Sequence, residues 1–280
     1  MTAQKDPMSV NKEPGAMAPT HALLQKLRDG QAVTALGVRG ARTPEIARLA
    51  RASGHDLIWV DLEHSSMPID AAASICACAH DLGMVALVRV PEREYGVIGR
   101  LLDGGAAGII APRIETAEQA ADVVAACRFP PLGHRSAIAQ LPALGYRRLP
   151  AAQVNDISNR HTLVKVLIES PAGIANLPHI LAVPGVDLIG IGANDLSAEL
   201  GVPGDYRHPS MRAALDAAIA ACRSAGKPLA IGGIADPAHV AELIAQGSAP
   251  FMMTGIDTEI LLSSATERVQ RAMSAFPVPA

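Results

Sequence analysis

The chain has 280 residues, a formal charge of −3 at pH 7 and a hydrophobic fraction of 49%, with only 2% aromatic residues. This composition indicates a soluble globular protein with an aliphatic core, and the lack of a basic stripe excludes nucleic acid and anionic membrane surfaces as partners. Residues 1–20 lack the apolar segment of a signal peptide, and no run is long enough to cross a bilayer. We therefore expect a cytoplasmic protein with a disordered leader over residues 1–20 and one domain over residues 21–280.

The cysteines are spaced neither as a zinc ligand set nor as a CxxC redox pair. They are Cys76, Cys78, Cys127 and Cys222. We expect them to be buried free thiols, which fits a reducing compartment.

From Val33 onward, short β-branched runs alternate with longer Ala-rich segments of helical period. The predicted strands are 33–38, 57–61, 84–90, 107–111, 163–168, 186–191, 228–231 and 250–254. Eight strands alternating with helices over about 250 residues predict a closed (β/α)8 TIM barrel that forms a single domain. A doubly wound open sheet is the alternative.

Local signals mark the ends of several predicted helices. Thr43-Pro44 and Ser170-Pro171 each place a capping hydroxyl before a proline at the first helical position. Gly54, Gly83 and Gly226 end helices just before the next strand. The interval between Phe129 and Thr162 has little helical period, and so we expect a long loop that acts as a lid or contacts another subunit.

Ionisable side chains follow the predicted strands at their C-terminal ends, where barrel enzymes build their sites. Asp61-Leu62-Glu63-His64 follows the apolar run of the second strand without a break. Arg89 closes the third strand, Glu169 closes the fifth, and Asp195 follows the sixth. The alternative for the first group is that Asp61 and Glu63 only cap the next helix while His64 packs.

Glu169 and Asp195 provide hard oxygen ligands on adjacent strands. Such ligands suit Mg or Mn and accept Co or Zn, which predicts a divalent metal site with open positions. Structural ion pairs with arginines at the barrel mouth are the alternative. Because Gly192 has no side chain, a ligand could approach the backbone there, so that the amides of Gly192 and Ala193 hold a substrate carboxylate.

The fifth strand also carries Lys165, which the strand alternation directs into the barrel. An inward lysine raises the rival mechanism, in which a Schiff base forms with the substrate. Four residues at about 3.3 Å each place Lys165 roughly 13 Å below Glu169. We therefore expect a buried ion pair at Lys165 instead of a nucleophile.

Together these positions resemble the HpcH/HpaI family, the class II metal-dependent pyruvate aldolases. The resemblance covers residues 30–262. Its motifs are Asp61-Leu62-Glu63-His64, Leu87-Val88-Arg89-Val90-Pro91, Leu102-Asp103-Gly104-Gly105-Ala106, Phe129-Pro130-Pro131-Leu132-Gly133-His134-Arg135, Ile168-Glu169-Ser170 and Gly192-Ala193-Asn194-Asp195-Leu196-Ser197.

The resemblance implies a modified barrel that exchanges its last helix between subunits of a hexamer, a trimer of dimers. It also implies that Glu169 and Asp195 bind the metal, that Arg89 lies beside the enolate oxygen, and that His64, oriented by Asp61, moves protons together with a water. Pyruvate would chelate the metal through its keto and carboxylate oxygens, and a base would remove the proton from the 4-hydroxyl group.

Three positions depart from the family pattern. Leu167 stands where several members place a glutamine that touches pyruvate, Ala193 replaces a frequent proline, and Ser136 replaces a glycine after the loop arginine. These departures affect the substrate-binding positions Gly192, Ala193 and Leu167 but leave the metal and proton chemistry intact. The related citrate lyase and malyl-CoA lyase branch lacks a histidine at the position of His64.

The sequence therefore predicts an aldolase that reversibly cleaves a 4-hydroxy-2-oxo acid to pyruvate and an aldehyde. Two other readings stay open. One is a related metal-enolate lyase or decarboxylase that acts on oxaloacetate or on an acyl substrate of the citrate lyase type. The other is a barrel without catalysis that serves as a binding or assembly protein.

Overall fold

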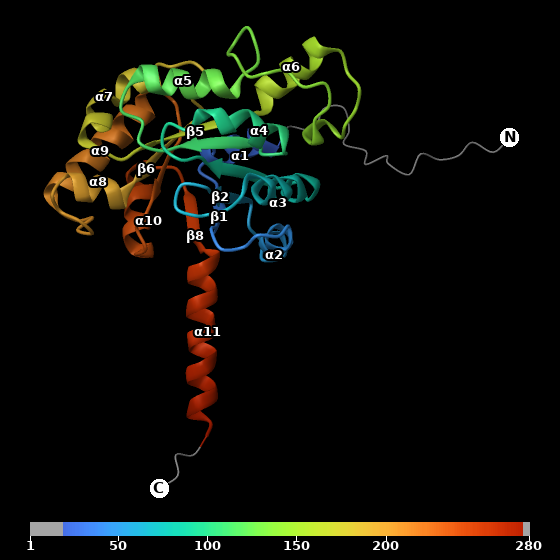
Figure 1. Ribbon diagram of the computed structural model, residues 1–280. Coiled ribbons are helices and arrows are strands. Elements are labelled where there is room, and N and C mark those ends of the chain that lie inside the picture. Colours follow the sequence, from blue (N-terminus) through green and yellow to red (C-terminus); the bar gives the residue numbers. More distant parts are fainter. Residues whose placement is uncertain (1–18, 277–280) are drawn as a thin grey trace.

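The computed structural model describes residues 19–276, and it contains one sheet of eight parallel strands (Figure 1). The strand order is β7-β6-β5-β4-β3-β2-β1-β8. Ala249, just before β8, donates its main-chain N–H to Leu229 in β7 over 2.8 Å, so the two ends of the sheet meet. The result is a nearly closed (β/α)8 barrel, which confirms the predicted fold class.

The strand positions agree with the predicted ones to within about two residues, as expected for short apolar runs. The strands are β1 Val33–Val38, β2 Leu57–Asp61, β3 Val85–Arg89, β4 Gly108–Ala111, β5 Leu163–Ile168, β6 Leu188–Gly192, β7 Leu229–Gly232 and β8 Phe251–Ile256. The helices are α1 Pro19–Arg28, α2 Glu45–Ala52, α3 Ile69–Asp81, α4 Ile98–Asp103, α5 Ala117–Cys127, α6 Ala151–His161, α7 Pro171–Leu181, α8 Ala193–Glu199, α9 Pro209–Ser224, α10 Pro237–Gln246 and α11 Asp257–Ser274, with short 3-10 turns η1 Tyr95–Val97 and η2 Pro142–Leu144.

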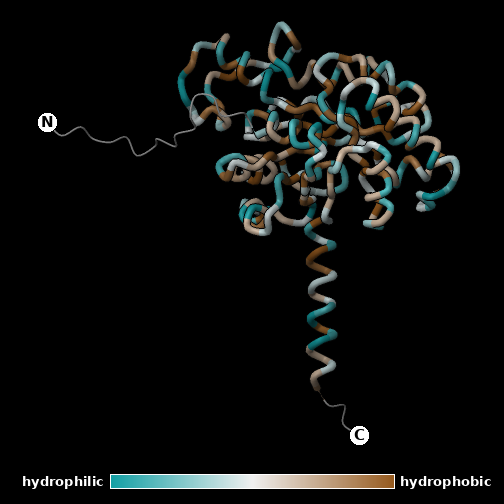
Figure 2. Tube along the Cα trace, turned by 180° about the vertical axis from the view of Figure 1, so that it is seen from behind, coloured by the Kyte–Doolittle hydropathy of each residue, from teal (hydrophilic) through white to brown (hydrophobic). Residues whose placement is uncertain are grey.

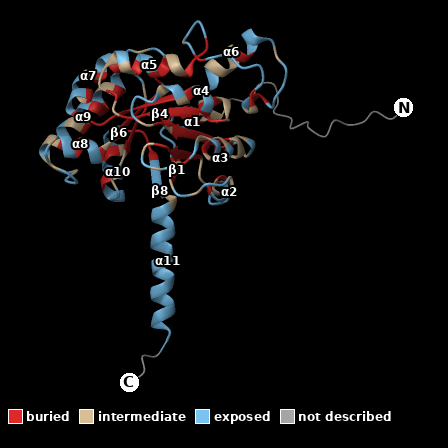
Figure 3. Ribbon diagram, viewed as in Figure 1, coloured by how far each residue is buried: buried red, intermediate tan, exposed pale blue. Residues whose placement is uncertain are grey.

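Side-chain alternation along the strands divides the buried residues into two layers. In β5, Val164, Val166 and Ile168 pack outward against the helices, whereas Leu163 and Leu167 belong to the cluster inside the barrel. Because residues two apart point to the same face of a strand, Lys165 and Glu169 share the inner face with Leu167. Figure 3 shows this buried centre surrounded by helices with exposed outer faces.

The inner cluster is closed at the N-terminal end of the barrel by α1. Leu23, Leu24 and Leu27 of this helix pack against the first residues of the strands. Of the predicted leader, residues 1–18 lie outside the described residues, and Pro19 and Thr20 already belong to α1. The last two residues of the predicted leader are therefore helical.

The cap predictions have mixed outcomes. Ser170 accepts a hydrogen bond from the main-chain N–H of Gly173 at the start of α7, as predicted. The cap predicted at Thr43 is wrong, because α2 begins after Pro44 without a side-chain capping bond. Gly54, Gly83 and Gly226 all have positive φ just after a helix, where glycine avoids the steric cost of a Cβ atom.

The interval between Phe129 and Thr162 is not a plain loop, since it contains α6. This helix buries only Val154, which packs against Leu141 and Leu144 in a small separate core. One buried position in three turns gives almost no hydrophobic period, and this explains why the sequence did not reveal the helix.

The last helix, α11, does not return to the barrel but extends away from it (Figures 1 and 3). None of its residues is buried, and Figure 2 shows apolar positions along it. The exposed apolar side chains include Leu261, Leu262 and Met273, which are 71%, 69% and 68% exposed. Among the described residues, no helix is both long and apolar enough to cross a membrane.

Candidate active site

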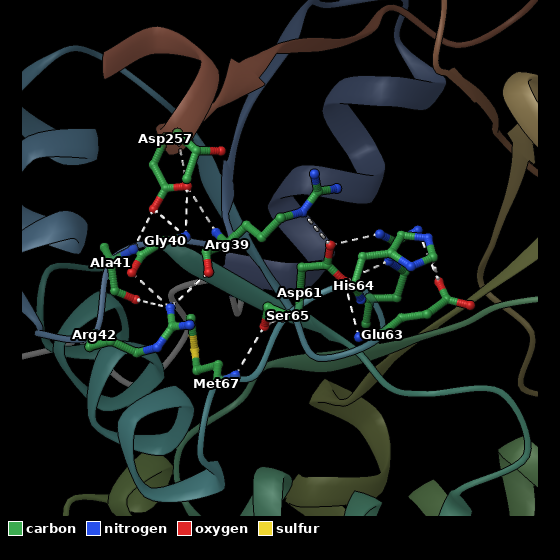
Figure 4. A network of polar contacts seen from close by, with 12 residues as sticks. Arg39, Gly40, Ala41, Arg42, Asp61, Glu63, His64, Ser65, Met67 and Asp257 are labelled. Atoms are coloured by element: carbon green, nitrogen blue, oxygen red, sulfur yellow. Dashed lines mark hydrogen bonds and ion pairs between the residues drawn. The ribbon is translucent and has the colours of Figure 1, made fainter. Parts of the chain in front are cut away.

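Asp61, the last residue of β2, is the most highly connected buried carboxylate at the C-terminal mouth of the barrel. Arg89, on the neighbouring strand β3, donates from Nε and Nη2 to its two oxygens over 3.0 and 2.7 Å. Arg39, which follows β1, donates from Nε over 3.1 Å. Asp61 is therefore held between two arginines, as Figure 4 shows for Arg39.

The loop after β2 is also fixed by Asp61. The carboxylate accepts the main-chain N–H groups of Glu63 and His64 over 3.1 and 3.2 Å. Thus Asp61 contacts His64 through the main-chain N–H of that residue, while the imidazole points elsewhere. The ring of His64 is 55% exposed, and its Nε2 lies 3.7 Å from Glu63 Oε2, so the imidazole faces the open mouth.

Glu63 shares Arg89 with Asp61, because Arg89 Nη1 lies 3.0 Å from Glu63 Oε2. Burial raises the pKa of Glu63 despite this pairing, and the nearby charges of Asp61, Asp195 and Glu92 raise it further. Burial also opposes ionisation of Asp61, but the hydrogen bonds and charge of Arg89 outweigh it and hold the pKa of Asp61 below its usual value. Asp61 therefore ionises more readily than an ordinary aspartate, whereas Glu63 takes up a proton more readily than an ordinary glutamate.

Glu169 follows β5 and is buried at the mouth. Its Oε2 accepts the main-chain N–H of Arg113 over 2.9 Å, and no ion pair reaches it among the described residues. Burial raises its pKa, and the charges of Glu63 and Asp195 add to this effect although Arg113 and Arg89 oppose it. An ionised carboxylate in this position lacks a cation.

Gly192 at the end of β6 makes room for Glu169. A Cβ atom at Gly192 would lie 2.2 Å from Glu169 Oε1, so any larger residue would displace the carboxylate. The absence of a side chain at residue 192 thus leaves room for the Glu169 carboxylate, whereas we had predicted that it leaves room for a ligand. Ala193, at the start of α8, is buried, while Asp195 in the first turn of α8 is exposed.

Arg113 fixes Glu169 at a conformational cost. Its φ is +52°, a left-handed conformation that is uncommon for a residue with a side chain and often occurs at functional sites. The guanidinium group bonds Glu199 of α8 and lies 3.7 Å from Glu92. These pairs hold Arg113 across the mouth, which keeps its main-chain N–H directed at Glu169.

The donor chemistry of Glu169 and Asp195 fits a divalent cation. Among residues 19–276 no group of three or more His, Cys, Asp or Glu side chains forms a ready metal cage. However, Glu169 is a buried carboxylate without a cationic partner, and Asp195 adds to its electrostatic repulsion. A divalent ion bound by these two carboxylates and by ligand oxygens would relieve both penalties.

Lys165 does not form the ion pair that we expected. Its Nζ lies 4.5 Å from the ring centroid of Phe251, and no carboxylate lies within ion-pair distance of it among the described residues. A Cβ atom on Gly190 would lie 2.8 Å from Lys165 Cε and 2.4 Å from Leu167 Cδ2, so both side chains use the space left by this glycine. Burial lowers the pKa of Lys165 to about 8, helped by the charge of Arg89.

The sequence did not identify Arg39 or Arg113 as site residues. Both follow a strand directly or within two residues, which is a usable signal in a barrel. Neither position, however, stands in a motif on which the resemblance depends. Arg39 contacts Asp61, which lies 22 residues later in the sequence, and Arg113 contacts Glu169, which lies 56 residues later.

Carboxylates, arginines and an imidazole at the C-terminal mouth of a (β/α)8 barrel define the chain as a barrel enzyme. Residues 38–264 match the family model described as HpcH/HpaI aldolase/citrate lyase. The chain belongs to the HpcH/HpaI aldolase/citrate lyase family, as its motifs predicted, and is an enzyme of the carbon–carbon lyase class.

Named relatives cover nearly the whole chain. It is 38% identical over 255 residues to a 4-hydroxy-4-methyl-2-oxoglutarate aldolase of Chaetomium globosum, an alignment that covers 90% of this chain and 94% of the relative. It is 31% identical to a hydroxypyruvate/pyruvate aldolase of Pseudomonas aeruginosa, with 93% and 96% covered. The crystal structure of an HpcH/HpaI aldolase from Desulfitobacterium hafniense superposes with a TM-score of 0.82 at 26% identity, covering 91% of this chain and 97% of the other.

Proposed function

We propose that this protein is a class II pyruvate aldolase, which reversibly cleaves a 4-hydroxy-2-oxo acid to pyruvate and an aldehyde. The proposal depends on the state of Glu169. Its carboxylate is buried beside the Asp61–Arg89 pair and has no cationic partner among the described residues. The aldolase names of relatives that match about nine tenths of the chain support the same reaction.

Glu169 and Asp195 would hold the metal, which we propose to be Mg, Mn or Co, with Zn acceptable to the same oxygen donors. When bound, such a cation supplies Lewis acidity that polarises the 2-oxo group and offsets the negative charge of the enolate. Arg113 keeps Glu169 in place through its main-chain N–H.

Arg89 is the residue that we assign to enolate stabilisation. Its guanidinium is fixed by Asp61 and Glu63, and therefore it does not have to reorganise when negative charge develops on the substrate. The two hydrogen bonds to Asp61 keep Arg89 oriented. The amides at Gly192 and Ala193 would bind the pyruvate carboxylate, while Leu167 contributes an apolar wall beneath it.

His64 is the residue that we assign to proton transfer at the 4-hydroxyl group. Its imidazole is exposed at the mouth next to Glu63, where a water can connect it to the substrate. In cleavage, the 4-hydroxyl proton passes to His64 through this water, the bond between C3 and C4 breaks, and its electron pair forms the enolate of pyruvate. The aldehyde leaves, and a proton returned to C3 completes pyruvate.

Metal removal tests the proposal and separates it from the Schiff-base mechanism. Chelator should abolish pyruvate release from 4-hydroxy-2-oxo acids, and Mg, Mn or Co should restore it. Borohydride added together with pyruvate should leave no adduct on Lys165, which lies against Phe251 below the mouth. A chelator-resistant activity with a trapped Lys165 adduct would overturn the assignment.

We also propose that the protein works in the cytoplasm as a homo-oligomer, a hexamer built as a trimer of dimers that exchange α11. Two observations support the exchange. The helix exposes Leu261, Leu262 and Met273, and a large apolar surface of this kind normally meets a partner. Within residues 19–276, no helix covers the outer face of β8, where Met252 is exposed, although the last strand of a barrel normally has such a helix.

A further inference from the structure

Arg39, Arg89 and Arg113 contact carboxylates at the mouth of the barrel, and they differ in how completely these carboxylates pair with them. Arg89 faces Asp61 and Glu63, and Arg113 bonds Glu199 and lies near Glu92. Both guanidinium groups are therefore neutralised by carboxylates. Arg39 differs, because only its Nε donates, and its acceptor Asp61 is already paired with Arg89.

The two terminal nitrogens of Arg39 have no acceptor among the described residues, and its side chain is 31% exposed. In Figure 4 they point away from Asp61. A guanidinium held through Nε, with both Nη groups free, presents the fork that binds a carboxylate through two parallel hydrogen bonds.

The backbone that carries Arg39 is fixed as well. Asp257 accepts the main-chain N–H groups of Arg39, Gly40 and Ala41 over 2.7 to 3.0 Å. Arg42 folds back and donates to the carbonyl groups of the same loop. Because the loop is held from both sides, little conformational freedom remains to be lost when a ligand binds Arg39.

The position of Arg39 relates it to the aldehyde half of the substrate. The proposed metal ligands follow β5 and β6, whereas His64 follows β2 and Arg39 follows β1. A substrate whose 2-oxo acid end lies at Glu169 and whose 4-hydroxyl group lies at His64 would extend its remaining carbon atoms toward β1. That end of the substrate meets Arg39.

We infer that Arg39 is a specificity-determining residue, which selects 4-hydroxy-2-oxo acids that carry a second carboxylate on the aldehyde half. This inference rests on the proposed function and names its substrate class. In the synthetic direction, the acceptor would be an aldehyde or ketone that bears a carboxylate. Substrates with an uncharged tail would leave the Arg39 guanidinium without its acceptor.

The test compares substrates that differ in this charge. We would measure kcat/KM for 4-hydroxy-2-oxoglutarate, its homologue 4-hydroxy-2-oxoadipate, and 4-hydroxy-2-oxopentanoate, in which a methyl group replaces the carboxylate. The enzyme should prefer at least one dicarboxylate about 10- to 100-fold, the range expected for charge-assisted hydrogen bonds. Arg39→Gln should reduce this ratio to nearly one, and Arg39→Lys should retain part of it.

The ratio separates a specificity role from a structural one, because any disturbance of Asp61 affects all three substrates alike. Arg93→Gln is the matched control, since it removes a charge from the mouth at a residue that pairs with Glu92, and it should preserve the ratio. An equal loss on all substrates, or an enzyme without preference, would overturn the inference. Failure to release pyruvate from any of these acids would instead refute the proposed aldolase activity.

Discussion

Replacing Lys165 by methionine should stabilise the protein, and by an amount that depends on pH. Burial lowers the pKa of Lys165 from 10.5 to about 8, so folding disfavours the charged ammonium. At about 1.4 kcal/mol per pKa unit, the charge costs about 3 kcal/mol at pH 7. The cation–π contact with the Phe251 ring offsets about 1 kcal/mol of this cost.

Methionine has a similar volume and also packs well against an aromatic ring. Lys165→Met should therefore raise the free energy of unfolding by about 2 kcal/mol at pH 7. For a protein of this size, that change corresponds to an increase in Tm of about 5 °C.

The sign of the pH dependence follows from the lowered pKa. Below about pH 8, the lysine is protonated in both the folded and unfolded states, and the full penalty is present. Between this value and 10.5, the unfolded state binds more protons, so the stability of the unmodified protein rises with pH. The advantage of the variant should fall below about 1 kcal/mol by pH 10.

Thermal melts of both proteins from pH 7 to pH 10 measure this difference, and general effects of alkaline pH cancel in the comparison. Lys26→Met is the control, because that lysine lies at the surface and pairs with Asp56. Its effect should stay within about 1 kcal/mol at every pH. A Lys165→Met variant that is less stable at pH 7, or equally stabilised at pH 7 and pH 10, would show that folding does not lower the pKa of Lys165.

Other predictions concern the proposed reaction and assembly. Arg89→Ala should slow both aldol cleavage and oxaloacetate decarboxylation, because both reactions pass through the enolate. His64→Ala should slow aldol cleavage by about 10²- to 10⁴-fold and should slow decarboxylation less. Equal losses in the two reactions for His64→Ala would contradict the role of His64 as a base. Glu169→Gln, Asp195→Asn and the double variant should fall to nearly the same residual rate with reduced metal content, and active single variants with full metal occupancy would disprove a shared site. Removal of residues 257–280 should lower the number of subunits in the assembly, measured by light scattering, and an unchanged number of subunits would exclude exchange of this helix.

The sequence was informative where a residue's role depends on its place at a strand end. Asp61, Arg89 and Glu169 directly follow or close apolar runs, and the parallel topology alone brings such residues to one mouth. The side-chain contacts of these residues were harder to predict from the sequence. The imidazole of His64 lies beside Glu63, a contact that the motif did not specify, and the turn after β2 directs main-chain N–H groups at Asp61.

Lys165 shows why inward-facing charges are difficult to assign from sequence. The alternation correctly directed it into the barrel, and the distance of about 13 Å between Cα positions suggested a separate ion pair below the site. In the structure, however, the lysine side chain lies in the space that Gly190 leaves, and its Nζ meets an aromatic ring instead of a carboxylate. Its neighbour Phe251 comes from β8, and no local pattern predicts that contact.

Asp257 connects the helix that leaves the barrel to the loop that carries Arg39. It is the first residue of α11, and its carboxylate organises three consecutive main-chain N–H groups after β1. If α11 packs on another subunit as proposed, then assembly and recognition of the substrate tail share one carboxylate. Thermodynamic reciprocity then requires that a ligand bound at Arg39 changes subunit association by the same factor by which association changes the binding of that ligand.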